Sequence, residues 1–476
     1  MQSYTIKKRI SWQMILCFMM ILISLLVAIL ILTDFKKPGY YWGLFSLPLS
    51  FGALSVIFYR LYYEIPSNLG ISIILVLLFT RMVISPFFMY LGNYIGTITK
   101  NVEKNTYYAI LLVIYEELVI FITLFIKNQK EYKKATIDID RSESYYIRPK
   151  ISSIYKALLI LALLINALCL YKAPVLLSGY RTIFDISEEN FTGYEDSQLV
   201  AKYGTTFMTK LALVTGQYLT RALLILVPAY FIINASSKKT RPHKFIAFVS
   251  CFIPLFFIGG TIARSLIYIV CLLFLYNYMF NNIKATKKSM LLLVMAGITV
   301  IAWWIYRSGT SGGLFEQFSR RFSAYFSGVN VVSGVFNLPK DVEYRLRYFL
   351  YDFSNIPYGN TIFRPAHDNI HLFFNAYNSS SGQIPTNIGM GYYYFGPILA
   401  PIYSIIFTCV SFNSAVKLKE NIYAHPIRCI RLLLMTFSFS MGIIMYDIDI
   451  TMTSFFTLLL PMYIMERISY KKKKVL

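Results

Sequence analysis

Long apolar runs recur along almost the whole chain, and they constrain the fold more than any other feature. A helix needs about 20 mostly apolar residues to cross the hydrocarbon core of a bilayer, and it satisfies its own backbone N–H and C=O groups there. We therefore predict an all-α, polytopic integral membrane protein with about twelve transmembrane helices. These lie near residues 11–33, 41–60, 69–92, 106–127, 152–172, 207–234, 245–260, 265–281, 289–306, 389–412, 429–446 and 450–466.

Composition supports lipid as the solvent, since hydrophobic residues make up 57% of the chain and charged residues only 14%. The net charge of +23 would suit nucleic acid, but the lysines cluster in short loops between apolar runs. Lysines there set orientation or touch anionic lipid headgroups, so we predict membrane lipids and no nucleic acid as partners. The six cysteines lie in or beside apolar runs, which disfavours a disulfide framework. No cofactor and no metal site are predicted.

Basic residues also indicate the orientation, because they favour the cytoplasmic side. With the N- and C-termini cytoplasmic, the basic groups at 7–9, 127–150, 238–244, 284–288, 417–428 and 471–474 all fall inside. The first apolar run is too long for a signal peptide and lacks a small-residue cleavage site, so it is predicted to be a membrane helix.

The whole chain, residues 1–476, is then one integral membrane domain with two long outer loops, at 173–206 and 307–388. The second loop lies between the predicted ninth and tenth helices, is rich in Tyr and Phe, and has helical patterns at 315–326 and 342–353. On the cytoplasmic side, residues 128–150 are too few for a nucleotide-binding domain, and no phosphate-binding glycine motif occurs. An activated group used at the outer face must therefore arrive attached to a lipid.

The loop at 307–388 contains six arginines but one lysine, Lys340, against the usual bias of outer segments. Guanidinium groups grip phosphate in a bidentate way, so the arginines favour a pyrophosphate site. The predicted pyrophosphate-binding residues are Arg264, Arg320, Arg321, Arg364 and Arg345. Ordinary ion pairs at spacing i,i+4 are the alternative for Arg345 with Asp341, Arg347 with Glu343 and Arg320 with Glu316. Arg264, at the end of a span after two glycines, has snorkelling to headgroups as its alternative.

Candidate bases lie in the same loop and near the last spans. His367 and His371 are four residues apart, and histidine titrates near neutral pH, as a base for a sugar hydroxyl requires. Asp447, at the predicted outer turn between the last two spans, is a further candidate catalytic residue or an arginine partner. Histidines that only donate or accept structural hydrogen bonds remain the alternative.

A polar and then aromatic stretch at 379–396 provides candidate sugar contacts. Asn387, Tyr392 and Tyr393 combine hydrogen bonding with ring faces that could stack on a sugar. An interfacial aromatic belt explains the same tyrosines more simply.

Charged residues also occur inside the predicted spans. Arg81, Glu116 and Glu117 lie at similar depth in neighbouring spans, where an unpaired charge is costly, so we predict a buried ion pair. A polar cavity for substrate is the alternative. Arg221, in the middle of the sixth span, has no acidic partner in its own predicted helix.

Taken together, these residues resemble the Wzy-type O-antigen and repeat-unit polysaccharide polymerases. The resemblance covers most of the chain in topology and rests on three places in sequence: Gly259-Gly-Thr-Ile-Ala-Arg264, Arg320-Arg321 and Ile384-Pro-Thr-Asn-Ile-Gly389. It implies an undecaprenyl-pyrophosphate-linked oligosaccharide as donor and acceptor, in the bacterial cytoplasmic membrane. It also implies a polysaccharide chain-length regulator as a partner.

Two other classes stay open. Flippases for lipid-linked oligosaccharides also have many spans, but they favour two similar halves and short outer loops, unlike this chain. O-antigen ligases use the same donor and carry a histidine followed directly by asparagine. Here Asp368 follows His367 and Leu372 follows His371, which departs from the ligase pattern.

Overall fold

The computed structural model describes fourteen stretches of the chain, and every structural statement below concerns these residues. They are 12–33, 43–65, 67–94, 96–135, 153–177, 204–238, 240–256, 262–280, 313–326, 328–352, 370–380, 383–421, 426–445 and 448–469. The described residues form helices, turns and connecting segments, with no strand among them. The predicted all-α character is therefore confirmed for this part of the chain.

The chain divides into two compact units, which are described separately. The first unit takes 1–142, 308–419 and 436–453, and the second takes 143–307, 420–435 and 454–476. Helices of the first unit are α1 (Trp12–Thr33), α2 (Ser46–Ile57), η2 (Tyr59–Glu64), α3 (Leu69–Phe79), η3 (Thr80–Ile84), α4 (Ser85–Leu91), α5 (Val102–Ala135), α14 (Leu314–Tyr325), α15 (Val329–Val335), α16 (Val342–Tyr351), α18 (Ile370–Tyr377), α19 (Asn387–Phe395), α20 (Ile402–Asn421) and α22 (Ile448–Ser454).

The second unit contains α6 (Ser153–Lys172), η5 (Pro174–Leu177), α10 (Phe207–Lys238), α11 (Arg241–Ser250), η6 (Ile253–Phe256), α12 (Ile262–Met279), η7 (Phe455–Leu459) and α23 (Leu460–Ser469). The helix α21 (Pro426–Ile444) contributes its first part to this unit and its second part to the other. Tyr155 of α6 donates a hydrogen bond to the carbonyl of Leu226 in α10 over 3.1 Å. The neighbouring buried pair Thr220 and Asn166 also joins α10 to α6.

Six helices in the described residues are long and apolar enough to cross a membrane. They are Trp12–Thr33, Leu69–Leu91, Lys104–Glu131, Ser153–Lys172, Phe207–Ser236 and Ile427–Ile444. Shorter apolar helices lie at Ser46–Ile57, Tyr268–Asn277 and Ile402–Leu418. The protein thus has the character of a helical, multi-pass membrane protein, while the total of twelve spans and the orientation stay predictions.

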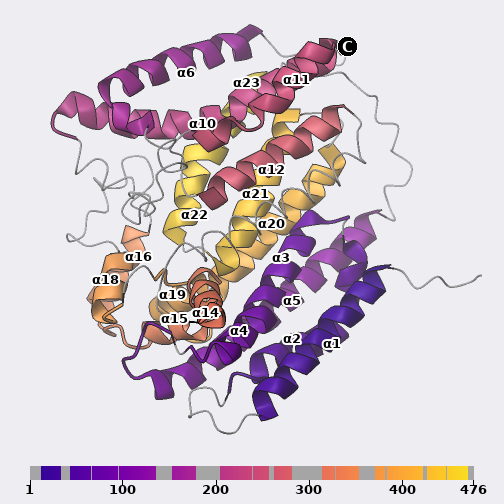
Figure 1. Cartoon of the computed structure of the whole chain (residues 1–476), viewed down its shortest axis with the longest axis vertical. Helices are drawn as coiled ribbons and strands as arrows, with labels where there is room; N and C mark the ends of the chain where they lie inside the picture. The colour runs from indigo at the N-terminus through magenta and orange to yellow at the C-terminus, as the bar shows by residue number, and fades with distance from the viewer. Residues whose placement is uncertain are drawn as a thin grey trace, which may run out of the picture. The chain divides into compact units, whose positions relative to one another are not determined.

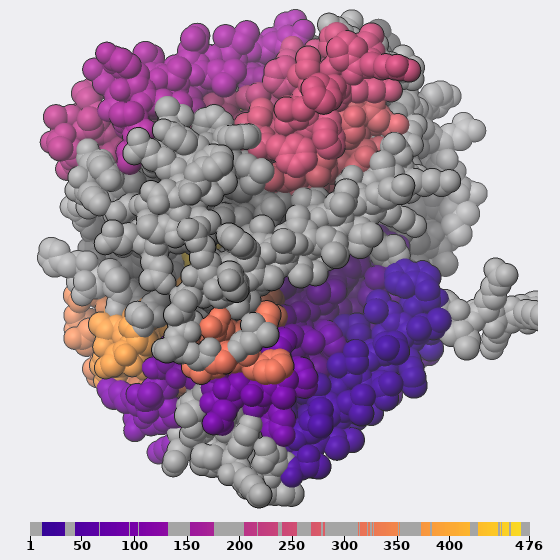
Figure 2. Space-filling model, in the orientation of Figure 1, coloured from indigo at the N-terminus to yellow at the C-terminus, as the bar shows by residue number. Residues whose placement is uncertain are grey.

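The outer surface of the first unit supports a lipid environment. On α1, the side chains of Trp12, Phe18 and Ile29 are 52%, 63% and 55% exposed. This helix, coloured indigo, lies at the surface in Figure 2. An apolar surface of this extent along a whole helix is unusual against water and is expected where lipid covers it.

Two predicted spans differ from the structure. The predicted span at 389–412 is divided into α19 and α20, because Gly396 has a φ of +81°, which only glycine adopts readily, and two prolines, Pro397 and Pro401, follow it. The predicted span at 245–260 contains the end of the ten-residue α11 and the short η6. The predicted span at 289–306 lies outside the described residues, as do residues 178–203 of the first predicted loop.

In the first unit, α1, α2 and α5 pack side by side, and a second group of helices from 313–395 packs against α4 and α5 (Figure 1). The helical patterns predicted at 315–326 and 342–353 are confirmed as α14 and α16. Every residue of α15 is buried, and this short helix was not predicted. It joins α16, α18 and α19 through a cluster of buried residues formed by Ile98, Val331, Val335, Leu338, Tyr348, Phe374, Met390 and Tyr393.

Candidate functional site

Among the arginines of 313–352 whose side chains the structure describes, Arg345 is the one without an acidic partner. It lies half-buried on α16, and within the described part of the chain its guanidinium forms no ion pair. The alternative pair with Asp341 is therefore absent. Asp341 is the residue before the first turn of α16 and has extended backbone angles (φ −64°, ψ 137°), so it does not continue the helical face that carries Arg345.

The guanidinium of Arg345 instead lies by the ring of Tyr393, with its central carbon 5.8 Å from the ring centroid. This distance is within the range of a cation–π interaction, which satisfies the face of the guanidinium and leaves its edge N–H groups available. Its Nε has no hydrogen-bond partner although the atom is buried. Arg345 is therefore a positively charged group that no described carboxylate neutralises.

Tyr393 lies on α19 and contributes a second polar group without a partner. Its side chain is 3% exposed, and its hydroxyl forms no hydrogen bond in the described structure. A phenol has an ordinary pKa near 10, and an apolar environment favours its neutral form. The phenol is therefore neutral at pH 7 and keeps its proton as a hydrogen-bond donor.

The surrounding side chains hold this pair in place. Tyr394 donates a hydrogen bond to Oδ2 of the buried Asp352 over 2.8 Å, which joins α19 to the end of α16. The rings of Tyr348 and Phe373 stack with their centroids 4.3 Å apart and join α16 to α18. These contacts hold α16, α18 and α19, which carry Arg345 and Tyr393, together.

The other predicted sugar-binding residues take part in helix packing. Asn387 is fully buried and donates through Nδ2 to the carbonyl of Gly442 on α21, while its Oδ1 has no partner. The ring of Tyr392 packs on Phe336 with centroids 4.6 Å apart. Of the three residues, Tyr393 is the one whose ring lies by a described cation.

Arg320 and Arg347 form the local ion pairs that the helical spacing allows. Arg320 pairs with Glu316 on α14 over 3.2 Å and lies 5.6 Å from the ring centroid of Tyr94. Arg347 pairs with Glu343 on α16 over 3.8 Å, and the Glu343 side chain is largely exposed while that of Arg347 is partly exposed. Their charge is thus already partly balanced, unlike that of Arg345.

The remaining predicted site residues fall outside the description in whole or in part. Arg264, Arg321 and His371 lie on α12, α14 and α18, but the structure describes only their backbone. Arg364, His367 and Asp447 lie outside the described residues. Arg221 is buried on α10, in the second unit.

Inside the first unit the predicted buried ion pair is confirmed. Nη1 of Arg81 lies 2.5 Å from Oε2 of Glu116, and both side chains are almost fully buried. The hydroxyl of Ser404 on α20 donates to the other oxygen of Glu116. Arg81 lies in the π-helical turn η3 between α3 and α4, a local widening of the helix that is frequent at functional sites.

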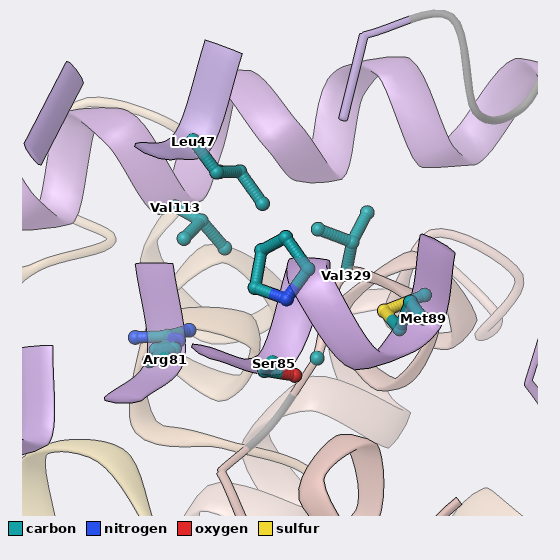
Figure 3. Close-up of a pocket in the computed structure, with 8 residues that line it drawn as sticks. Leu47, Arg81, Ser85, Met89, Val113 and Val329 are labelled. Atoms are coloured by element: carbon teal, nitrogen blue, oxygen red, sulfur yellow. The ribbon is translucent and has the colours of Figure 1, made fainter. Parts of the chain in front are cut away.

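A small cavity borders Arg81, and its size bears on whether these charged residues line a cavity for substrate, which was the alternative to a buried ion pair. Its walls include Leu47, Ser85, Met89, Val113 and Val329 (Figure 3), and the volume of the cavity is about 10 Å³. That is room for about one water and far too little for a sugar. Nε and Nη2 of Arg81 and the hydroxyl of Ser85 have no protein partner, so one bound water would suit this cavity.

Sequence reasoning missed a group of asparagines that assembles the region around α15. The amide of Asn330 makes two hydrogen bonds to the backbone of Ile98, one to its N–H and one to its carbonyl. The amide of Asn337 bonds to Asn105, Asn378 and the carbonyl of Lys100. The available signal was a pair of asparagines in a short, otherwise mostly apolar stretch, where a polar amide needs partners.

Comparisons with protein-family models, with curated proteins and with solved structures found no match to this chain. Among the described side chains, no three of His, Cys, Asp and Glu lie together as metal ligands would. All six cysteines are free.

Proposed function

We propose that the protein polymerises undecaprenyl-pyrophosphate-linked oligosaccharide repeat units at the outer face of a bacterial cytoplasmic membrane. In this reaction it transfers the growing glycan from one lipid carrier to the terminal sugar of another and releases undecaprenyl pyrophosphate. The observation that carries the proposal is Arg345. It is an arginine of the predicted outer loop that forms no ion pair with a described residue and lies by the ring of Tyr393, whose hydroxyl has no hydrogen-bond partner.

The chemistry of this pair suits a pyrophosphate leaving group. Negative charge grows on the pyrophosphate as the bond from the anomeric carbon to its oxygen breaks, and a fixed guanidinium stabilises that charge. The neutral phenol of Tyr393 can donate a hydrogen bond to the same anion. Arg264, Arg320, Arg321 and Arg364 are the further arginines proposed to surround it.

The acceptor hydroxyl must lose a proton while it attacks the anomeric carbon. We assign this step to His371, with His367 and Asp447 as the other candidate bases. Holding donor and acceptor in line supplies much of the acceleration, because the transfer then no longer depends on a chance encounter. Asn387 and Tyr392 are the proposed contacts to the glycan on α19.

Reconstitution of the purified protein into vesicles with lipid-linked repeat units tests the proposal. A polymerase yields a ladder of glycan lengths on the lipid carrier, resolved by electrophoresis. Transfer of single units to a different acceptor would indicate a ligase instead. Movement of unmodified donor across the bilayer would indicate a flippase. Either of these results, without a ladder, would contradict polymerisation.

A further inference from the structure

Two consecutive glutamates on α5 are buried and have different neighbours. Glu116 and Glu117 are 0% and 1% exposed. Successive residues of an α-helix point about 100° apart, so the two carboxyl groups meet different helices. Glu116 faces η3 and α20, whereas Glu117 faces α2. Of the two acids, Glu116 forms the ion pair with Arg81.

The partners of Glu116 are those of an ionised carboxylate. One oxygen accepts from the guanidinium of Arg81 and the other accepts from the hydroxyl of Ser404. Both oxygens therefore have donors, and one of these donors carries a positive charge. A buried carboxylate is stable in such surroundings because it is both paired and hydrogen-bonded.

Glu117 lacks these features. Its Oε2 accepts from the hydroxyl of Ser50 over 2.8 Å, while its Oε1 is buried without a partner, and no cation lies within 4 Å of it among the described residues. Removing an ionised carboxylate from water without a counter-charge costs far more than protonating it. The protonated acid is thus the form that these surroundings favour.

Apart from Arg81, the titratable groups near Glu117 in the described part of the chain offer no compensating charge. Tyr62 of η2 interacts electrostatically with Glu117 and with Cys17 of α1. A phenol and a thiol in apolar surroundings are neutral at pH 7. Arg81 interacts electrostatically with Glu117, but it forms its ion pair with Glu116.

We propose that Glu117 holds a proton at neutral pH, so that Arg81, Glu116 and Glu117 form a proton-binding site inside the helical bundle. With the proton bound, the cluster has one positive and one negative charge and is neutral. Loss of the proton adds a second carboxylate, for which Nε and Nη2 of Arg81 are still without partners. Arg81 lies in the turn that joins α3 to α4, and α4 packs on α14.

Infrared difference spectroscopy of the full chain in lipid nanodiscs tests this site. The spectrum of the wild-type protein at pH 7 should contain the carbonyl band of one buried carboxylic acid that is absent from Glu117→Gln. The band should shift in heavy water, as that of a protonated acid does. When the pH is raised, the acid band of the wild-type protein should give way to carboxylate bands, and the spectrum of Glu117→Gln should not show this change.

Three further variants complete the test. Glu131 is a half-buried glutamate near the end of the same helix, and Glu131→Gln should leave the acid band unchanged. Glu116→Gln should also remove the band, because Glu117 then ionises to pair with Arg81. If Glu117→Gln does not fold, Glu117→Met gives the same readout. A wild-type spectrum in which Glu117 contributes carboxylate bands at pH 7 would overturn the proposal, whatever the outcome of the polymerisation assay.

Discussion

Arg81 and Arg345 are both arginines in a largely apolar chain, yet their surroundings differ completely. Arg81 lies 2.5 Å from a buried carboxylate and forms part of the helix packing. Arg345 lies by a tyrosine ring and has no acidic neighbour at pairing distance among the described residues. The difference teaches that spacing in the sequence does not reveal which acid pairs with an arginine, because Asp341 has the spacing for Arg345 and forms no ion pair with it.

The two environments also predict opposite costs of mutation. A cation that neutralises a buried acid contributes to stability when it is present, because its removal leaves a charge in an apolar medium. A cation that awaits a ligand contributes mainly to binding or to the reaction. The following substitutions test this division, from the largest expected effect to the smallest.

Arg81→Met should destabilise the protein most, by about 3–5 kcal/mol, because it leaves Glu116 buried without its counter-charge or forces it to take up a proton. Unfolding in detergent, followed by heat or denaturant, measures this. The double variant Arg81→Met with Glu116→Gln should recover most of the loss. The distinction between the two arginines fails if Arg81→Met is no more damaging than Arg345→Ala.

Arg345→Ala should leave the fold intact and slow polymerisation. Loss of one group that stabilises the leaving charge raises the barrier by about 2–4 kcal/mol, which is roughly a 30- to 1,000-fold decrease in rate. The rate of ladder formation measures it, and Arg347→Ala on the same helix is the matched control. Equal rates for the Arg345 and Arg347 variants, at equal protein abundance, would remove Arg345 from the site.

Asn330→Ala should have an intermediate effect on stability, about 1–3 kcal/mol, since it leaves the buried N–H and carbonyl of Ile98 without partners. The loss should also weaken the support that α15 gives to α19 and so to Tyr393. Melting temperature measures the first effect, with the exposed Ser67→Ala as control. An unchanged melting temperature would mean that water replaces the amide at no cost.

Arg347→Ala should have the smallest effect, about 0.3–0.5 kcal/mol, because its pair with Glu343 is exposed and spans one helical turn. The unfolding midpoint measures it, preferably at low and high salt, because salt screens such a pair. A loss above about 1 kcal/mol would show that α16 depends on this pair more than its exposure indicates.

The local patterns were enough to predict several elements. Uniform apolar runs identified α1, α5 and α10, and the helical periods at 315–326 and 342–353 identified α14 and α16. The cost of an unpaired charge in an apolar span was enough to predict that Arg81 pairs with one of the two glutamates, Glu116 or Glu117. These features depend on residues that are near in sequence or on a charge balance that any fold in lipid must meet.

Which partners the polar groups find was decided by tertiary structure alone. Asn330 and Ile98 are 232 residues apart, so no local pattern could connect them. Asp341 has the right spacing for Arg345 but lies just outside the helix, and Gly396 ends α19 within a run that appeared long enough to be one span. Side-chain partners depend on how distant helices pack, whereas apolar length and charge balance are properties of the chain itself, and the sequence alone could determine only the latter.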